Sequence, residues 1–559
     1  MVENTKDYDI IFYMSNFLNS NLFLENFKKA CNGLYYVDKS LFIEDLIPSI
    51  NDENRFICIT RPRRFGKTIA ANMIASFFGK VDSSELFGNL AISEKKEIVK
   101  KHQNKHNVIF IDFSQNVEQN DTFNSYLERI VSKLKSDIFS AYKNLNLDEN
   151  LTLPDLLKEC WQKTNEGFFF VFDEWDAPFR FDFVSEKDKK HYVDFLHVLL
   201  KGQAYVEFAY MTGILPIKKY SSTSDLNIFL DYSLATQEKY SLYFGFTDKE
   251  VDFLYEKANK KLVDKNEKLT FTRDELRKWY DGYVTESGFH LYNPRSIVAA
   301  LNNNQLGNYW TSSGPSDEIF NILKLNVDEI QKPVAQLLAG ESVNCTINEN
   351  IINSKNTSSK LYVFSAMIVY GLLTTDGNNK VKIPNYEIMQ KFDEALQENN
   401  GLGYINQLAI KSSEILDAVL NEEEERVAAL LEFVHDTETP LFSYNRENEL
   451  TAVVNLAFLA ARDSYFVTRE DKSGKGFTDF VFTPKNPSDD CIILELKVDS
   501  TPQEALTQIQ QKNYSQRFSG KIGEVPFYTG RILLVGISYN RKEKKHFCKI
   551  VEGYKVKED

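Results

Sequence analysis

The sequence predicts an α/β protein with two separate sheets. Four short apolar runs, each followed by helix-length sequence, occur in the first 215 residues. Uninterrupted apolar strands that alternate with helices are typical of a parallel sheet with helices on both faces. Residues 246–440 have mostly polar, helical patterning, and strand-like runs return only after about residue 440. We therefore expect an α/β domain, a helical middle region and a second, small α/β domain.

The individual elements follow from these runs. In the first domain the expected strands are residues 55–60 (RFICIT), 107–113 (NVIFIDF), 167–172 (GFFFVF) and 207–211 (EFAYM). In the last domain they are residues 478–483 (TDFVFT), 491–498 (CIILELKV) and 531–537 (RILLVGI), with a helix around residues 503–518.

Composition and charge limit the partners. The 559 residues include 66 Lys and Arg against 80 Asp and Glu, a net charge of −14, which argues against a protein that coats nucleic acid by bulk charge. Residues 441–559 hold 18 basic and 16 acidic residues, a net charge of +2, which leaves −16 on residues 1–440. A terminal basic cluster is either a solvated hairpin or a nucleic-acid footprint: Arg541, Lys542, Lys544, Lys545 and Lys549.

The sequence also indicates a compartment. The longest mostly apolar run, residues 361–373, is shorter than the roughly 18 residues that a spanning helix needs, so we expect no membrane span. Residues 1–10 lack the pattern of a secretory signal. The six cysteines are scattered without CxxC spacing, which indicates reduced core thiols. An intracellular, cytoplasmic protein is expected, with a nuclear location left open.

Residues 61–68 (RPRRFGKT) form the first chemical motif. They follow the first strand and precede an expected helix over residues 69–78. A phosphate-binding loop needs free backbone N–H groups above a helix N-terminus, a lysine for the phosphates and a hydroxyl for Mg²⁺. Gly66, Lys67 and Thr68 supply these parts, although Arg61 replaces the usual first glycine. The motif predicts a P-loop NTPase.

A second motif supports this prediction. The apolar run 168–172 ends in Asp173 and Glu174. Such a strand carries carboxylates to the edge of the sheet, where Asp173 can hold Mg²⁺ and Glu174 can orient the attacking water. The alternative is an ordinary strand exit followed by a helix cap.

The last domain carries a third constellation, formed by Asp479, Glu495 and Lys497. Side chains alternate along a strand, so Glu495 and Lys497 share one face, and the intervening residues 486–490 predict a hairpin that brings Asp479 to them. Two carboxylates can hold Mg²⁺, and a lysine beside them can orient the water that attacks a phosphodiester. Surface salt bridges are the alternative. Against it, Glu495 interrupts an apolar strand, where an unpaired charge is costly to bury.

Several motifs together resemble the AAA-ATPase-like family, whose members commonly carry a C-terminal PD-(D/E)XK nuclease-superfamily domain. The motifs are residues 36–40 (YVDKS), 61–68 (RPRRFGKT), 171–178 (VFDEWDAP), 212–214 (TGI), 244–247 (FGFT), 279–283 (WYDGY) and 292–294 (YNP). The resemblance covers about residues 20–320 and 440–550. In that family's loop an arginine stands at the position of Arg61.

The resemblance implies roles for further residues. Expected nucleotide contacts are Arg63, Arg64, Phe65, Gly66, Lys67, Thr68, Asp173 and Thr212, with Thr68 and Asp173 also binding Mg²⁺. Thr212 would sense the γ-phosphate or simply cap a strand end. Arg63 and Arg64 would reach phosphate or a neighbouring subunit's nucleotide, or belong to a solvated loop.

For the nuclease-like domain the resemblance implies a metal set of Glu449, Asp479 and Glu495, with Glu449 on a preceding helix. Gln510 and Tyr514 match the QxxxY arrangement found in some members, and Gln508 is a competing match for the glutamine.

The patterning along the chain and the resemblance together predict five parts. They are an N-terminal segment (1–30), an AAA-like P-loop ATPase domain (31–245), a helical lid (246–330), a helical linker region (331–440) and a PD-(D/E)XK nuclease-like domain (441–559).

Two main functions fit the sequence. The first is an ATP-binding and ATP-hydrolysing protein coupled to a Mg²⁺-dependent nuclease that acts on DNA, with an architecture compatible with a homo-oligomer. The alternative is a nucleotide-dependent molecular switch whose nuclease-like domain only binds nucleic acid or a protein partner; the charge of −16 on residues 1–440 favours it somewhat. A regulatory or defence-associated protein of mobile elements is a third, weaker hypothesis.

Overall fold

The structure is a computed structural model, in which the chain divides into two compact units. The structure describes residues 15–217, 228–234, 239–310, 333–334, 336–338, 340–345, 359–376, 379–398, 404–438, 447–473, 476–511, 518 and 528–553. The first unit comprises Met1–Trp310, Ile347–Lys355 and Ser365–Gly377, and the second comprises Thr311–Thr346, Asn356–Phe364 and Asn378–Asp559.

A five-stranded parallel sheet forms the centre of the first unit. Its order is β2-β3-β4-β1-β5, and its strands are β1 (Phe56–Thr60), β2 (Asn107–Asp112), β3 (Phe168–Asp173), β4 (Val206–Gly213) and β5 (Leu230–Tyr232). The four predicted strands and their parallel arrangement are confirmed. The sequence did not predict β5, because three residues give too short an apolar run.

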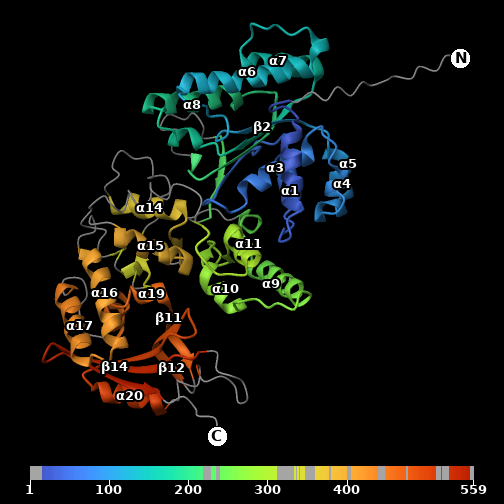
Figure 1. Ribbon diagram of the computed structural model, residues 1–559. Helices are drawn as coiled ribbons and strands as arrows, with labels where there is room; N and C mark the ends of the chain where they lie inside the picture. Colours follow the sequence, from blue (N-terminus) through green and yellow to red (C-terminus); the bar gives the residue numbers. More distant parts are fainter. Residues whose placement is uncertain are drawn as a thin grey trace. The chain divides into compact units, whose positions relative to one another are not determined.

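Alternate side chains of the strands pack into two separate cores, which explains their continuous apolar sequences. In β3, Phe168, Phe170 and Phe172 face one core, whereas Phe169 and Val171 face the other. Helices α6 (Phe123–Ala141), α7 (Leu153–Thr164) and α8 (Glu186–Leu200) cover the first face, and α1 (Asn21–Cys31) and α3 (Lys67–Phe78) cover the second (Figure 1). Short helices α2 (Phe42–Leu46), α4 (Ser84–Phe87) and α5 (Lys96–His102) complete these layers.

Capping boxes set the start of several helices. Thr122 and Ser125 begin α6 by exchanging side chain to backbone hydrogen bonds, and Ser185 and Asp188 do the same at α8. Such a box satisfies two N–H groups that the helix leaves without partners, so these helices begin where the sequence places a hydroxyl and a polar residue three positions apart.

The expected lid follows the sheet and is not wholly helical. It contains α9 (Asp248–Val263), α10 (Arg273–Tyr280), α11 (Pro294–Asn303) and a hairpin of β6 (Tyr283–Val284) and β7 (His290–Leu291). Asp248 at the start of α9 accepts hydrogen bonds from Arg273 (2.6 Å) and from the Tyr292 hydroxyl (2.5 Å). The 279–283 motif packs in the interior of the first unit, where Trp279, Tyr280 and Tyr283 are buried. Sequence Ser365–Gly377 adds the end of α14 (Lys360–Tyr370) and β9 (Thr374–Thr375) to this unit.

The second unit contains a mixed sheet in the order β11-β12-β13-β14-β15, in which only β13 and β14 run parallel. The strands are β11 (Tyr465–Ser473), β12 (Gly476–Pro484), β13 (Cys491–Val498), β14 (Ile532–Asn540) and β15 (Lys545–Gly553). The three predicted strands are confirmed. The sequence did not predict β11 and β15, which lie at the sheet edges and carry many polar residues.

Helices cover this second sheet. On one face, Leu506 and Ile509 of α20 (Pro502–Gln511) pack with Ile493 and Leu534. Next to α20 in sequence, residues 512–517 of the predicted helix lie outside the described residues. The remaining elements are β8 (Val343–Asn344), β10 (Lys380–Lys382), α15 (Tyr386–Glu398), α16 (Tyr404–Leu420), α17 (Glu424–Glu438), α18 (Glu447–Ala457) and α19 (Ala461–Ser464).

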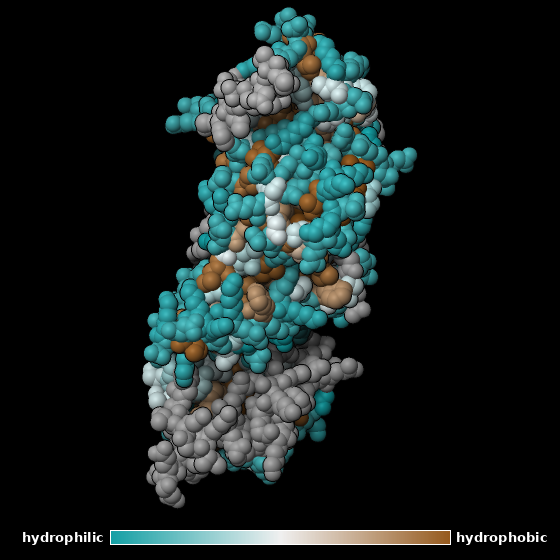
Figure 2. Space-filling model, turned by 90° about the vertical axis from the view of Figure 1, so that its right-hand side faces the viewer, coloured by the Kyte–Doolittle hydropathy of each residue, from teal (hydrophilic) through white to brown (hydrophobic). Residues whose placement is uncertain are grey.

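The cysteines, the helices and the surface bear on the expectations about disulfides and membrane spans. All six cysteines are free, and four of them are buried. Among the described helices, none has the length and apolar character needed to cross a membrane. Figure 2 shows a face on which hydrophilic side chains cover most of the described surface and hydrophobic ones form small, separate patches.

Candidate functional site

A cavity of about 580 Å³ lies over the start of α3 in the first unit. The P-loop forms one wall, and Glu174 lies in the lining. Segments on either side of the P-loop in sequence contribute further lining residues, among them Tyr35–Val37, Tyr243, Gly245, Phe246, Arg295 and Val298. All six predicted loop residues, 63–68, line this cavity, which is large enough for a nucleotide-sized ligand.

The loop ends in Gly66, which leads directly into α3. Gly66 has φ of 87° in the left-handed region, and a Cβ at this position would meet no atom within 4 Å. The backbone conformation, and not the available space, therefore favours glycine. No side chain caps the N-terminus of α3, so its first N–H groups remain available to an anion.

Lys67 is buried beneath the loop. Its ammonium group donates hydrogen bonds to the carbonyl oxygens of Arg61 and Pro62, both at 3.0 Å. Burial lowers the pKa of Lys67, while the negative charges of Glu174 and Asp173 act in the opposite direction. The lysine thus closes the loop on itself through bonds that a phosphate can replace.

Arg61 has a structural task that explains the departure from the usual motif. The residue is 1% exposed, and its guanidinium donates to the carbonyls of Thr60 and Tyr232, both at 2.7 Å, and to the Ser241 hydroxyl at 2.9 Å. These bonds join the end of β1 to β5 and to the short helical turn that contains Ser241. A glycine at position 61 would leave these three buried oxygen atoms without their hydrogen-bond donor.

Asp173 and Thr212 form a buried pair behind the cavity. The Thr212 hydroxyl donates to Oδ1 of Asp173, and both side chains are fully buried. Burial raises the pKa of Asp173 to about 7, and the charges of Asp112 and Glu174 add to this effect. Thr212 therefore holds the carboxylate in place, and its predicted contact with the γ-phosphate stays a prediction.

Glu174 is the acidic residue that reaches the cavity. It has φ of 49°, an uncommon conformation for a residue other than glycine. Arg180 holds its carboxylate at 2.9 Å and also binds Asp176 at 2.7 Å. Burial alone would raise the pKa of Glu174, but the charges of Lys67 and Arg180 hold it below its ordinary value.

Asp176 and Arg180 were missed in the sequence. Asp176 is fully buried and accepts hydrogen bonds from the backbone N–H groups of Ile214 and Leu215, so it fixes the chain after β4. The available signal was that these two residues follow the predicted metal-binding strand and stand four positions apart from one another, a spacing that suits an ion pair.

The other predicted loop residues differ in what they offer. The ring of Phe65 is buried and lies 4.9 Å from that of Tyr283, so its side chain packs in the interior and only its backbone is available to a ligand. Arg63 is close enough to lower the pKa of Glu174, and its carbonyl accepts a bond from Asn293 at 3.3 Å. Arg64, with φ of 71°, lines the cavity.

The second candidate site lies in the second unit, where β12 and β13 are antiparallel. Phe480 pairs with Leu494, which places Asp479 opposite Glu495. The Asp479 carboxylate accepts a hydrogen bond from the N–H of Leu496 at 2.8 Å. The predicted hairpin that brings Asp479 to Glu495 is confirmed.

Glu495 is almost completely buried, with 2% of its surface exposed. Its Oε1 accepts hydrogen bonds from Lys497, at 3.3 Å, and from the Gln508 amide on α20. Burial raises the pKa of Glu495 to about 7, and the neighbouring Asp479 adds to the shift while Lys497 opposes it. Such a shift is typical of a functional carboxylate.

Three further predictions for this site have different outcomes. Gln510 is exposed, whereas Gln508 contacts Glu495, so the structure favours the competing glutamine. Glu449 lies on α18, as expected, but its side chain lies outside the described part of the structure. Tyr514 lies outside the described residues altogether.

The donor sets fit a divalent cation that shares its coordination with a ligand. Oδ2 of Asp173 and Oε2 of Glu495 are both buried and make no hydrogen bond within the described residues. Thr68 and Asp173 in one unit, and Asp479 and Glu495 in the other, supply the hard oxygen donors that Mg²⁺ prefers. Where side chains are described, no group of three His, Cys, Asp or Glu could hold a metal ion. Phosphate and water would complete the first set, and phosphate, water or Glu449 the second.

The terminal basic cluster lies at the turn between β14 and β15 and on β15 itself. Arg541 donates to Asp499 at 2.6 Å, and Lys549 lies 3.2 Å from Glu424. Ion pairs thus engage two of its five residues, and both the solvated hairpin and the nucleic-acid footprint stay predictions.

Two family models match parts of the chain. Residues 23–223 match the family described as "Predicted AAA-ATPase", and residues 446–546 match the PD-(D/E)XK nuclease superfamily. The chain thus combines an AAA-ATPase-like domain with a C-terminal domain of the PD-(D/E)XK nuclease superfamily.

Individual relatives are distant. A protein of Azotobacter chroococcum mcd 1, known as the uncharacterized protein in the vnfD 5′ region, is 24% identical over 308 residues. The match covers 54% of this chain and 55% of the relative, so the chain spans about half the length of the curated protein that it matches.

Solved structures give weaker matches. The Walker-type ATPase PABY2304 of Pyrococcus abyssi has 12% identity and a TM-score of 0.35, covering 63% of this chain and 95% of that one. The ORC2 protein of Aeropyrum pernix, in its ADPNP–ADP complexes, has 11% identity and a TM-score of 0.31, covering 67% and 93%. The fold assignment therefore rests on strand order and register.

Restoring the usual glycine with Arg61→Gly should destabilise the protein. The substitution removes three hydrogen bonds and leaves buried acceptors without a donor, which costs at least about 2 kcal/mol. Urea unfolding measures the effect, with Arg64→Gly as the control because its positive φ suits glycine. An Arg61→Gly midpoint equal to that of the wild type would contradict the structural role of Arg61.

Lys67→Ala should weaken ATP binding by at least about tenfold, because a charge-assisted hydrogen bond to phosphate is lost. Titration with a fluorescent ATP analogue measures this, and circular dichroism checks folding. Lys80→Ala, which removes only an exposed ion pair with Glu166, is the control. Equal affinities for Lys67→Ala and wild-type protein would refute the loop assignment.

Asp173→Asn should stabilise the metal-free protein at high pH. A raised carboxyl pKa means that the folded state keeps a proton that the unfolded state releases, so this stability is lost as the pH rises from about 4 through about 7. The loss amounts to as much as about 4 kcal/mol, and asparagine avoids it. Urea midpoints in EDTA should differ at pH 8.5 and converge at pH 4; no gain at pH 8.5 would argue against a strained Asp173.

Proposed function

We propose that this chain is a Mg²⁺-dependent ATPase whose nucleotide state controls a Mg²⁺-dependent nuclease that acts on DNA. The observation that carries the proposal is shared by both units. At each candidate site a strand brings a carboxylate into the interior, and one of its oxygen atoms is buried without a hydrogen bond among the described residues. Leaving a buried acceptor unpaired is costly, so a cation bound with the ligand is the simplest partner.

At the first site, the chain's own residues would bind ATP and orient the water. The N-terminus of α3 and Lys67 would bind the phosphates, with Lys67 exchanging its two carbonyl acceptors for phosphate oxygens. Thr68 and Asp173 would hold Mg²⁺. Glu174, which is ionised and lies in the cavity lining, would accept a hydrogen bond from the attacking water.

The rest of the cavity would hold the nucleoside. Its lining also includes the apolar side chains of Tyr35, Val37 and Val298. An adenine ring can stack or pack against such side chains, whereas charged phosphates cannot. The base would therefore pack against this apolar wall.

At the second site, the chain's own residues would hold Mg²⁺ and orient the water that attacks a phosphodiester. Asp479 and Glu495 would hold Mg²⁺, with Glu449 on α18 as the third carboxylate. The cation, when bound, would neutralise charge on the phosphate that is attacked. Lys497, 3.3 Å from Glu495, would orient the water, and Gln508 would hold the Glu495 carboxylate in position.

The switch hypothesis remains as the second candidate, because one observation favours it. The first 440 residues carry a net charge of −16, and the terminal basic cluster is partly engaged in ion pairs. DNA binding gains much of its affinity from basic residues on phosphates. A domain that recognises a protein partner would need no such surface.

Cleavage of linear and circular DNA separates the two functions. Wild-type protein with Mg²⁺ or Mn²⁺ should cut DNA, and Glu495→Gln should reduce the rate at least about a hundredfold because a metal ligand is lost. Gln508→Ala should also slow cleavage, since it releases the Glu495 carboxylate. The matched control is Gln510→Ala, which changes an exposed glutamine on the same helix.

The same assay, run with and without ATP, tests the control by nucleotide. A rate that depends on ATP in the wild type and not in Lys67→Ala supports the coupling. Protein that hydrolyses ATP but leaves DNA intact under every condition would favour the molecular switch.

A further inference from the structure

The segment Ser365–Gly377 has an unusual place in the chain. It belongs to the first unit, although the sequence on both sides of it, Asn356–Phe364 and Asn378–Asp559, belongs to the second. Helix α14 begins at Lys360 in the second unit and ends at Tyr370 in the first. The backbone therefore connects this segment to the second unit on both of its sides in sequence.

The segment touches the phosphate loop through Gly371. This glycine has φ of 84°, and a Cβ here would lie 2.7 Å from Cβ and 3.0 Å from Cγ of Pro62. Both the left-handed backbone and the close approach exclude a side chain. Pro62 is the second residue of the loop, so the loop and the segment are in direct van der Waals contact.

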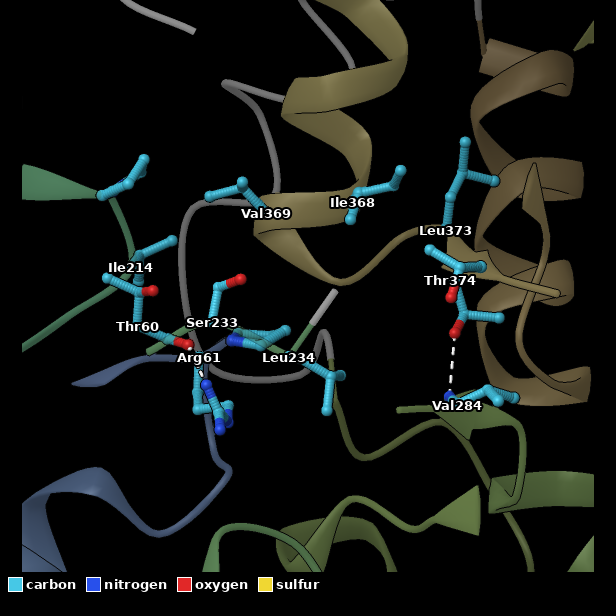
Figure 3. Close-up of a pocket in the computed structure, with 13 residues that line it drawn as sticks. Thr60, Arg61, Ile214, Ser233, Leu234, Val284, Ile368, Val369, Leu373 and Thr374 are labelled. Atoms are coloured by element: carbon cyan, nitrogen blue, oxygen red, sulfur yellow. Dashed lines mark hydrogen bonds between the residues drawn. The ribbon is translucent and has the colours of Figure 1, made fainter. Parts of the chain in front are cut away.

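Tyr283 provides a second connection. Its hydroxyl donates to the carbonyl of Gly371 at 2.9 Å, and its ring packs against Phe65 of the loop at 4.9 Å. The N–H of Val284 donates to the Thr374 hydroxyl at 3.0 Å, as Figure 3 shows. Tyr283, Phe65 and Thr374 are all buried, and tightly packed interiors transmit small shifts.

Little empty space separates the segment from the sheet edge. Val369 and Leu373 line a small cavity together with Thr60, Ile214 and Ser233, all labelled in Figure 3. Its volume of about 20 Å³ holds roughly one water molecule. The segment thus has room for a small movement, whereas a large one would break its contacts.

Lys67 links this contact to the nucleotide. In this structure its ammonium group binds the carbonyl of Pro62 at 3.0 Å, and Pro62 is the residue that meets Gly371. A phosphate that takes over Lys67 releases this carbonyl. Arg61, anchored by its own buried bonds, limits how far the release spreads toward β1, so Pro62 is the point that can move.

We propose that Gly371, Tyr283 and Thr374 are positioning residues of the nucleotide site and that residues 370–374 report its occupancy to the second unit. Binding of phosphate exchanges the Lys67–Pro62 bond, shifts Pro62 against Gly371 and changes the packing of the segment. This inference rests on the proposed ATP site, and it does not require nuclease activity.

Hydrogen–deuterium exchange of the full chain, with and without Mg²⁺ and a non-hydrolysable ATP analogue, tests the proposal. The expected result is protection at residues 66–70 together with altered exchange at residues 365–376 in the wild type, both absent in Lys67→Ala. Protection at 66–70 without any change at 365–376 would overturn the inference and leave the ATP site standing. No protection at 66–70 would overturn both.

Nucleotide affinity provides the reciprocal test, because coupling between two sites acts equally in both directions. Gly371→Ala should change the dissociation constant of the ATP analogue by at least about fivefold. Gly288→Ala is the matched control, since Gly288 has a similar φ of 86° but a Cβ there meets nothing within 4 Å. Equal constants for these two variants would contradict a role for the contact with Pro62.

Two substitutions that each remove a single hydrogen bond keep the test valid if Gly371→Ala fails to fold. Tyr283→Phe removes the hydrogen bond to Gly371 but keeps the ring against Phe65, and it should shift the dissociation constant in the same direction. Thr374→Val should do likewise, and Thr374→Ser, which keeps the hydroxyl, should restore the wild-type value. Wild-type affinity in both Tyr283→Phe and Thr374→Val would overturn the proposal.

Discussion

The first unit depends on one buried positive charge, the ammonium group of Lys67 at the start of α3. It lies among Asp173, Glu174 and Asp176, whose charges offset the cost of its burial. Its hydrogen bonds to the loop carbonyls keep the phosphate-binding loop closed. Arg180 balances the surplus of acidic groups by binding Glu174 and Asp176. The site is therefore an electrostatic network that a polyanionic ligand must rearrange in order to bind.

The two units apply the same physical principle to different sheets. In each, an apolar strand carries a carboxylate into the interior, and burial raises its pKa to about 7. A hydrogen-bond donor from a neighbouring element fixes one oxygen: Thr212 on β4 for Asp173, and Gln508 on α20 for Glu495. The other oxygen has no hydrogen bond among the described residues. Binding of metal and phosphate would remove the free-energy cost of this unpaired buried oxygen. The stability of each site would therefore depend on its ligand.

Much of this arrangement could be predicted from sequence because the signals are local. Continuous apolar runs identified the central strands, and the spacing of Glu495 and Lys497 identified their shared face. Residues whose roles depend on distant partners were not predictable in this way. Arg61 was recognised as a departure from the general motif that the resembled family shares, but its structural role required knowledge of its acceptors on β5 and Ser241. Likewise, the choice between Gln508 and Gln510 depends on which face of α20 is turned toward the sheet, and the sequence alone does not give this orientation.

Photoaffinity labelling with 8-azido-ATP tests the central claim, that the cavity over α3 is an ATP site, most directly. Mass spectrometry of the labelled full chain should locate the adduct on peptides that contain Tyr35–Val37 or Val298, the apolar wall assigned to the base. Excess Mg²⁺-ATP should prevent the labelling. Saturable, ATP-competed labelling confined to other peptides, or no competed labelling at all, would contradict the account.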